Sequence, residues 1–316
     1  MVTKTPSARH VSKSKKAKPF LKWAGGKSQL ISQFDEYFPD ELKQGKIDNY
    51  IEPFVGGGAV FFHVAQRYEI SKAYLYDINQ ELIIALKTVQ REPHELIEEL
   101  HELSSRYDNL KEDEKRDFYY HTRERFNENR LNIDYENFST EWVERTAQLI
   151  FLNRTCFNGL FRLNSKGEFN VPHGKYKNPR IVNEENILTV HKLSKLAEIK
   201  TGDFAECEAV ITPSSFIYFD PPYRPISQTA SFTSYSKYSF DDQSQIRLAN
   251  FFRHLDEKYN VKMMLSNSDP TNENHDDRFF ESLFEGFNIY KVRASRMINC
   301  NAERRGQINE ILVTNY

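Results

Sequence analysis

The chain is poor in the residues that cross-link a protein or anchor it in a membrane. Its only cysteines are Cys156, Cys207 and Cys300, and their wide spacing matches neither a disulfide framework nor a metal-binding motif. No apolar run approaches the ~20 residues that a membrane-spanning helix needs. An odd number of cysteines without a signal peptide indicates a reducing compartment, so we expect a cytoplasmic protein with no metal and no membrane partner.

The chain also lacks a net charge of either sign. Its 43 Lys and Arg residues nearly balance its 45 Asp and Glu residues, so any attraction to a polyanion has to be local. Residues 1–18 contain six basic residues and no acid, a composition that predicts a disordered basic tail. The remaining length is sufficient for one large domain and a smaller one.

Prolines are few, yet two of them directly follow the apolar run 215–219 in the sequence Asp220-Pro221-Pro222-Tyr223. The run predicts a buried strand of a mostly parallel sheet, which must end there because proline has no N–H to donate. Ligands of such sheets bind at the carboxyl ends of the strands. Asp220 and a proline carbonyl could accept both hydrogens of a nucleobase amine while Tyr223 stacks on the ring. An ordinary solvated turn is the alternative that these residues leave open.

Glycine is also scarce, but three glycines stand together at 56–58, after a predicted strand that ends near Phe54. The next predicted strand, 73–77, ends in Asp77, about twenty residues further on. This spacing predicts a carboxylate at the ribose hydroxyls of a nucleoside cofactor. A nicotinamide fingerprint would need glycine where Phe61 stands, so that cofactor is disfavoured.

The Gly-Lys-Ser sequence at 26–28 resembles the end of a phosphate-binding loop. That loop needs a glycine where Leu21 stands, so we reject it. A helix predicted over 28–37 instead places Trp23 and Lys27 near its amino end, where they suit an adenine ring and a carboxylate. A packed helix start is the alternative.

Residues 91–150 are charged and helical in period, with no strand pattern, and so predict an insertion between strands. The following segment, 154–180, has six basic residues and one acid, Glu168. Within it, 159–171 predicts a β-hairpin whose turn is 164–167. A basic hairpin can enter a groove of DNA, although a solvated hairpin is the alternative.

Three more stretches in the second half carry predictions. Asp203 and Phe204 end a predicted strand and could meet an adenine amine and ring, although a plain strand end is equally consistent. The polar, aromatic loop 227–239 has the length of a mobile binding loop. Basic residues between 293 and 305 could contact phosphate.

These motifs together resemble the Dam-type N6-adenine DNA methyltransferases. Their order is cofactor helix, glycine loop, acidic strand end, recognition region and catalytic tetrapeptide, and the resemblance covers nearly everything from Pro19 to Tyr316. It is closest to the GATC-specific modification methylases of type II restriction–modification systems (the DpnII type). The stretches that carry it are 20–27, 52–58, 157–162, 168–172 and 220–223.

The resemblance implies S-adenosylmethionine as the cofactor and a clamp on an adenine that has been rotated out of the duplex. The clamp residues would be Asp220, Pro221, Pro222 and Tyr223. The residues implied to contact the cofactor are Trp23, Lys27, Phe54, Gly56, Gly58, Asp77, Asp203, Phe204 and Asp220.

The resemblance also implies residues that contact double-stranded DNA. The hairpin residues by themselves predict the kinds of contact: Arg162 could pair with guanine, Leu160 and Pro172 could meet a thymine methyl group, and Lys166 could neutralise phosphate. The full implied set is Lys22, Asn158, Leu160, Arg162, Lys166, Pro172 and Tyr176. The basic tail of 1–18 is a departure, because the family pattern does not require it.

The implied architecture is a Rossmann-like α/β methyltransferase sheet, formed by 19–90 and 187–316, with a mostly helical DNA-recognition domain inserted at 91–186 that carries the hairpin. We expect a monomeric, site-specific adenine-N6 methyltransferase. An N4-cytosine methyltransferase is the alternative within enzymes, because the same clamp can hold the amine of cytosine. A DNA-binding regulator with a vestigial pocket is the alternative outside them.

Overall fold

A computed structural model describes residues 16–224, 240–295 and 307–316. Nearly all of the expected basic tail, the whole loop 227–239 and most of the basic segment 293–305 lie outside the described residues.

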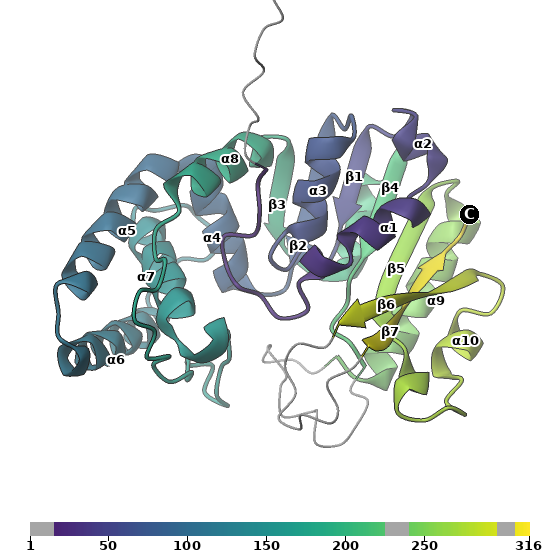
Figure 1. The fold of residues 1–316 in the computed structure, drawn as a ribbon. Coiled ribbons are helices and arrows are strands. Elements are labelled where there is room, and N and C mark those ends of the chain that lie inside the picture. Colours follow the sequence, from purple (N-terminus) through teal and green to yellow (C-terminus); the bar gives the residue numbers. More distant parts are fainter. Residues whose placement is uncertain (1–15, 225–239, 296–306) are drawn as a thin grey trace, which may run out of the picture.

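Within the described residues, seven strands form one sheet in the order β3-β2-β1-β4-β5-β7-β6 (Figure 1). The five strands from β3 to β5 in this order are parallel, and β7 runs antiparallel to both β5 and β6. The prediction of a mostly parallel α/β sheet is therefore confirmed. The strands are β1 (Asn49–Glu52), β2 (Lys72–Asp77), β3 (Ala197–Thr201), β4 (Ser215–Phe219), β5 (Lys262–Ser268), β6 (Asn288–Ser295) and β7 (Gln307–Thr314).

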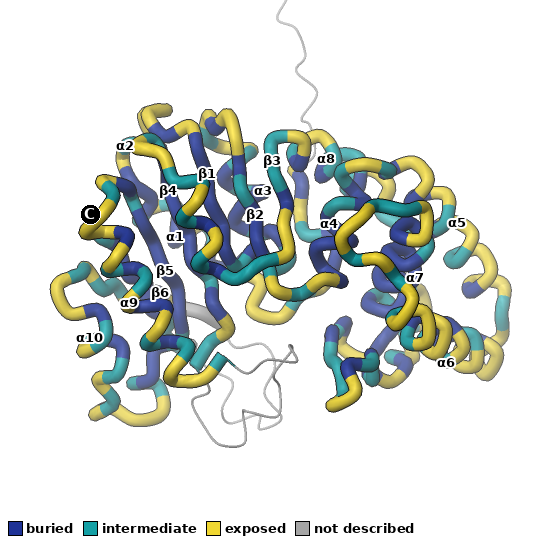
Figure 2. Tube along the Cα trace, turned by 180° about the vertical axis from the view of Figure 1, so that it is seen from behind, coloured by how far each residue is buried: buried dark blue, intermediate teal, exposed yellow. Residues whose placement is uncertain are grey.

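The central strands are apolar because both faces of the sheet are covered. Every residue of β1 and β4 is buried, and Figure 2 shows these strands as a dark blue centre. Successive side chains point to opposite faces, so Tyr50 belongs to one hydrophobic cluster and Ile51 to the other. Such double burial explains why the strands are continuous apolar runs rather than alternating ones.

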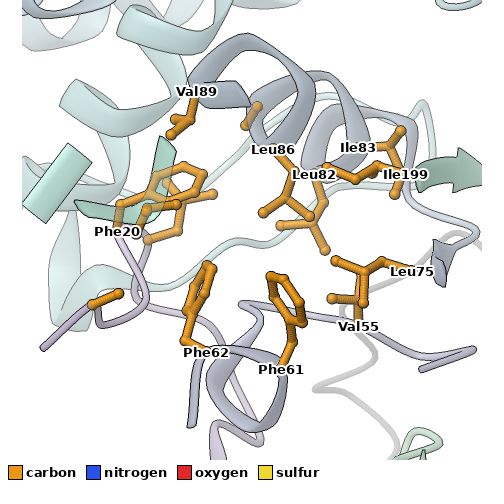
Figure 3. Close-up of a cluster of buried hydrophobic side chains, with 14 of the residues drawn as sticks. Phe20, Val55, Phe61, Phe62, Leu75, Leu82, Ile83, Leu86, Val89 and Ile199 are labelled. Carbon is orange, nitrogen blue, oxygen red and sulfur yellow. The ribbon is translucent and has the colours of Figure 1, made fainter. Parts of the chain in front are cut away.

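Helices cover both faces of the sheet. One cluster contains residues of α1 (Ile31–Tyr37), α3 (Ala59–Arg67) and α4 (Gln80–Arg91). In Figure 3, Phe61 and Phe62 of α3 face Leu82 and Leu86 of α4. The opposite cluster contains residues of α9 (Asp242–Lys258) and α10 (Phe279–Leu283). The remaining short helix near the amino end is α2 (Asp40–Lys43).

Apart from α4, the helices between β2 and β3 lie beside the sheet, on the side of β3 (Figure 1). They are α5 (Pro93–Asp108), α6 (Glu112–Asn129), α7 (Glu141–Thr155) and α8 (Glu184–Ser194). Their apolar side chains belong to the same cluster as α3 and α4, so one hydrophobic core runs from the sheet into these helices. This continuity holds α7, and the segment that follows it, in a fixed place relative to the sheet.

Residues 159–171 were predicted to form a hairpin, and they double back without forming a regular two-stranded ladder. One isolated bridge pairs Leu163 with Phe169. The turn is closed by the Asn164 N–H, which donates to the Glu168 carbonyl at 2.9 Å, and by the Gly167 N–H, which donates to the Asn164 carbonyl at 2.9 Å. Leu163 and Phe169 form a pair without mutual hydrogen bonds, so the Phe169 N–H points away from the opposite arm. The Asn127 side chain of α6 accepts from this N–H at 2.8 Å and so fastens the segment to α6.

None of the helices within the described residues has the length and apolar composition needed to cross a lipid bilayer.

A buried ion pair joins α4 to α7. The Arg145 Nε donates to the Glu81 carboxylate at 2.7 Å, and the Tyr135 hydroxyl donates to the same carboxylate at 2.6 Å. The Arg145 side chain is only 3% exposed, so its removal leaves an uncompensated carboxylate in a buried place. We therefore expect Arg145→Ala to lower the free energy of unfolding by about 3–5 kcal/mol, measured by urea denaturation.

Arg125→Ala is the matched control. Arg125 pairs with Glu144 at 2.7 Å, but both side chains are about half exposed. Its removal should change the free energy of unfolding by only about 0–1 kcal/mol. Equal losses in the two variants would contradict the role given to burial.

Candidate active site

The tetrapeptide 220–223 begins where β4 ends, and its acid is held by two partners. The Lys27 Nζ lies 2.8 Å from the Asp220 Oδ1, and the Ser266 hydroxyl donates to the same oxygen at 3.0 Å. Burial raises the pKa of Asp220, and the charge of Lys27 opposes that rise. The carboxylate is therefore kept at the carboxyl edge of the sheet by a cation from a segment almost two hundred residues away in sequence.

Lys27 joins three parts of this site. Its ammonium donates to the Gly25 carbonyl at 2.8 Å and lies 4.3 Å from the centroid of the Tyr223 ring. The side chain is 3% exposed, so the ammonium sits between a carboxylate and an aromatic face, away from solvent. The structure thus brings together three residues that the sequence placed in one site: Lys27, Asp220 and Tyr223.

Three further residues belong to the site, and none of them was predicted from the sequence. Glu310 of β7 accepts the hydrogen bond of the Tyr223 hydroxyl, and burial raises the pKa of Glu310. Glu52 ends β1, accepts from the Tyr50 hydroxyl at 2.8 Å and also has a raised pKa, because it is buried. Ser266 belongs to the polar run that ends β5, so the strand-end rule applied to Asp220 could have identified it.

The glycine turn after β1 contacts Asp77. The Gly56 N–H donates to the Asp77 carboxylate at 3.0 Å, and the Asn79 N–H donates to it at 2.9 Å. Gly56 has a φ of +49°, and a Cβ there would lie 3.3 Å from the Trp23 ring. A side chain at this position would therefore be strained and crowded, which explains why glycine stands there.

Apolar rings surround this turn. Phe54 and Phe204 stack with their centroids 5.5 Å apart, and Phe240 meets Phe54 edge-on at 5.7 Å. Trp23 stacks on Phe161 at 5.1 Å, which connects the amino-terminal segment to the segment after α7. Phe161 is thus a packing partner of Trp23.

Asp203 is engaged in a different way from the one the sequence suggested. Its carboxylate accepts from the Arg247 guanidinium, with the Nη1 contact at 2.8 Å, and from the Ala205 N–H at 3.0 Å. The arginine lowers the pKa of Asp203. Asp203 is thus an ion-pair partner and the cap of the short helix Phe204–Val210, and its contact with an adenine amine stays a prediction.

The residues predicted to contact DNA form a second group, after α7. The Arg162 Nε donates to the Asn170 side chain at 2.8 Å, and the Lys22 ammonium lies 5.4 Å from the centroid of the Tyr176 ring. Asn158 is exposed, with a φ of +57°. Leu160 is half-buried, and Lys166 and Pro172 are exposed. Lys22 lies one residue from Trp23, so the two groups meet at the amino-terminal segment.

A mostly parallel sheet of this order, with acidic side chains at the carboxyl ends of β1, β2 and β4, is consistent with a methyltransferase fold. Residues 23–298 match the model of the D12 class N6 adenine-specific DNA methyltransferases. The chain belongs to this family, and it is an adenine-specific DNA methyltransferase. Membership does not favour the cytosine-specific alternative or the non-catalytic regulator.

Curated relatives match almost end to end. The chain is 51% identical over 300 residues to the type II methyltransferase M.MjaIII of Methanocaldococcus jannaschii, which covers 95% of this chain and 99% of that one. It is 38% identical over 301 residues to the type II methyltransferase M1.LlaDCHI of Lactococcus lactis subsp. cremoris, which covers 95% of each chain. It is 32% identical over 298 residues to the DNA adenine methylase of Escherichia coli, which covers 94% of this chain and 95% of that one.

The environment of Asp77 gives a prediction about pH. Burial raises the pKa of Asp77 from 3.8 to about 6, although bonds from backbone N–H groups oppose the rise. The folded protein then binds the Asp77 proton more tightly than the unfolded chain does. The contribution of Asp77 to the free energy of unfolding therefore falls as pH rises through the range 4 to 6. Asp77→Asn removes this titration, so its stability relative to the wild type should rise by about 2 kcal/mol between pH 4 and pH 7.

Urea denaturation of both proteins at several pH values measures this difference. A stability difference that stays constant from pH 4 to pH 7 would contradict the raised pKa.

Proposed function

We propose that this chain transfers a methyl group from S-adenosylmethionine to N6 of an adenine rotated out of duplex DNA, within GATC, as the modification enzyme of a restriction–modification system. The observation that carries the adenine clamp is the place of the Lys27 ammonium, 2.8 Å from Asp220 and 4.3 Å from the Tyr223 ring centroid. An N–H donor fits between that carboxylate and that ring, which is the arrangement that a stacked base with an exocyclic amine requires.

The residues around the glycine turn fit a nucleoside cofactor. Asp77 is held at the carboxyl end of β2 by two backbone N–H groups, and a carboxylate there suits ribose hydroxyls. Phe54 and Phe204 supply apolar surface for the adenine ring of the cofactor, and Lys27 supplies a cation for the cofactor carboxylate. S-adenosylmethionine, when bound, supplies a methyl group made electrophilic by its sulfonium.

The protein contributes mainly by positioning. Asp220 and a proline carbonyl hold the two amine hydrogens, so the lone pair of N6 leaves the conjugation of the ring and points toward the methyl carbon. A bond forms from N6 to that carbon as the carbon–sulfur bond breaks, and the nitrogen then loses a proton to water. Such alignment contributes several kcal/mol, and acceptors aimed at the nitrogen as it becomes cationic add to it.

The DNA side of the proposal is supported by the segment after α7 and by the relatives. Two of these relatives are named type II methyltransferases, and the family resemblance points to GATC. Arg162 would read a guanine, while Leu160, Pro172 and Lys22 would contact other base pairs. Asn158, Tyr176 and Lys166 would contact the backbone or the surroundings of the target. We also propose that residues 91–186 act as the target-recognition domain.

Asp220→Asn tests the clamp, because it keeps the size of the side chain but removes its charge and one acceptor oxygen. We expect transfer of a tritiated methyl group to a GATC duplex to fall by at least about a hundredfold. Asp117→Asn, on the exposed face of α6, is the control and should retain wild-type turnover. Wild-type turnover in Asp220→Asn would show that the clamp is assigned wrongly.

Arg162→Ala and Lys166→Ala test how DNA is read. In Arg162→Ala, loss of a bidentate guanine contact should reduce discrimination at one base pair by about 1–3 kcal/mol. The discrimination is measured as the ratio of kcat/KM values for GATC and single-substitution duplexes. In Lys166→Ala, loss of a phosphate contact should weaken binding to all DNA sequences alike and reduce the salt dependence of that binding. A uniform loss in Arg162→Ala would make Arg162 a phosphate contact instead.

A further inference from the structure

A buried glutamine holds the backbone of the catalytic tetrapeptide. Gln245 of α9 donates through its Nε2 to the Pro222 carbonyl at 3.0 Å, and the residue is 2% exposed. The tetrapeptide offers few other backbone contacts, because neither proline has an N–H to donate. No donor among the described residues bonds the neighbouring Pro221 carbonyl.

A second buried amide determines which way Gln245 faces. Asn267 of β5 is fully buried and donates through its Nδ2 to the Gln245 Oε1 at 3.1 Å. The Asn267 Oδ1 accepts from the Ser268 backbone N–H at 2.8 Å and from the Arg224 backbone N–H at 3.4 Å. Because backbone N–H groups face the Asn267 oxygen, its amide nitrogen must face Gln245. That contact in turn directs the Gln245 nitrogen to Pro222.

The two proline carbonyls differ in their hydrogen bonding within the described residues. Proline fixes φ near −65°, and the residue before a proline is biased to extended angles, so Pro221 favours a polyproline-like conformation. In a polyproline-like segment successive carbonyls are turned by about 120°. The bond from Gln245 occupies the Pro222 carbonyl, while the Pro221 carbonyl accepts from no donor among the described residues. The bond to Gln245 therefore decides which proline carbonyl is free to act as the second acceptor beside Asp220.

We propose that Gln245, oriented by Asn267, is a positioning residue that occupies the Pro222 carbonyl and so presents the Pro221 carbonyl to the amine of the flipped base. The inference rests on the proposed function, since it concerns the acceptor that works with Asp220. It assigns no contact with substrate to Gln245 or Asn267. Both act through the backbone of the tetrapeptide.

The first experiment compares Gln245→Met with Gln243→Met in the full-length enzyme. Methionine keeps nearly the volume of glutamine but cannot donate to Pro222, and Gln243 is an exposed residue of the same helix. We expect the single-turnover rate of methyl transfer to a GATC duplex to fall roughly tenfold to a hundredfold in Gln245→Met, because a misplaced acceptor misaligns the amine. The exposed control should stay within about twofold of the wild type, as is usual for surface substitutions.

The second experiment is a binding measurement that a merely structural role would not alter. Duplexes with adenine or with purine at the target position differ only in the exocyclic amine. In the presence of S-adenosylhomocysteine, Gln245→Met should bind the adenine duplex about threefold to tenfold more weakly than the wild type, as expected for loss of one hydrogen bond. Its affinity for the purine duplex should not change. Because the comparison is made within each protein preparation, a partly unfolded preparation does not imitate this result.

Asn267→Asp provides an independent variant. Aspartate cannot donate to Gln245, so the glutamine amide should turn and present its oxygen to the Pro222 carbonyl. We expect this variant to reproduce the selective loss of adenine affinity, and to add little when combined with Gln245→Met. Equal weakening on adenine and purine duplexes, or full additivity of the two substitutions, would overturn the inference.

The wild-type enzyme separates this inference from the proposed function. If the wild type does not methylate adenine, the proposed function fails. If the wild type methylates adenine and Gln245→Met does so at the same rate, the proposed function stands and the positioning role fails.

Discussion

The contact between Lys27 and Asp220 is the interaction on which the arrangement of the site depends. A carboxylate at the covered edge of a sheet is costly unless a cation or strong donors compensate it. Lys27, only 3% exposed, and Ser266 of β5 provide that compensation. The same ammonium bonds the Gly25 carbonyl and faces the Tyr223 ring, so one cation ties the amino-terminal segment to the strand that carries the tetrapeptide.

The parallel sheet explains why so many polar side chains gather at one edge. β1, β2, β4 and β5 all end on this side, and they deliver Glu52, Asp77, Asp220 and Ser266 to it. The glycine turn after β1 allows the backbone to approach Trp23 closely. At this edge, burial raises the pKa values of the Glu52, Asp77 and Asp220 carboxyl groups. Electrostatic interactions are stronger in such surroundings than in bulk water.

The helical part and the sheet share one hydrophobic core, and this has a consequence for substrate recognition. Trp23 stacks on Phe161, and the Lys22 N–H donates to the Asn153 side chain at 2.7 Å. The segment with the proposed base contacts is therefore packed directly against the segment with the proposed cofactor contacts. A site that must align a base in DNA with a bound methyl donor benefits from this rigid connection, because a displacement of about 1 Å can cost a hundredfold in rate.

The sequence by itself was sufficient for the class of fold and the order of the motifs, and it assigned to one site Lys27, Asp220 and Tyr223, which the structure brings together. Apolar runs predicted buried strands, and the residues at their carboxyl ends, such as Asp77 and Asp220, lie at one edge of the sheet because parallel strands end on one side. The family is carried by these local motifs, and the match to residues 23–298 confirms it.

Only the tertiary structure identified the residues that support the site. Glu310 reaches Tyr223 from a strand 87 residues further along, and Arg247 reaches Asp203 from a helix 44 residues further along. Gln245 has no motif that distinguishes it from any other polar residue of an amphipathic helix. The hairpin expected from turn and alternation patterns became an irregular segment with one isolated bridge, and Asn127 of α6 accepts from its outward-facing Phe169 N–H. Local patterns specify strands and turns, whereas partners distant in sequence are chosen by the packing of the whole chain.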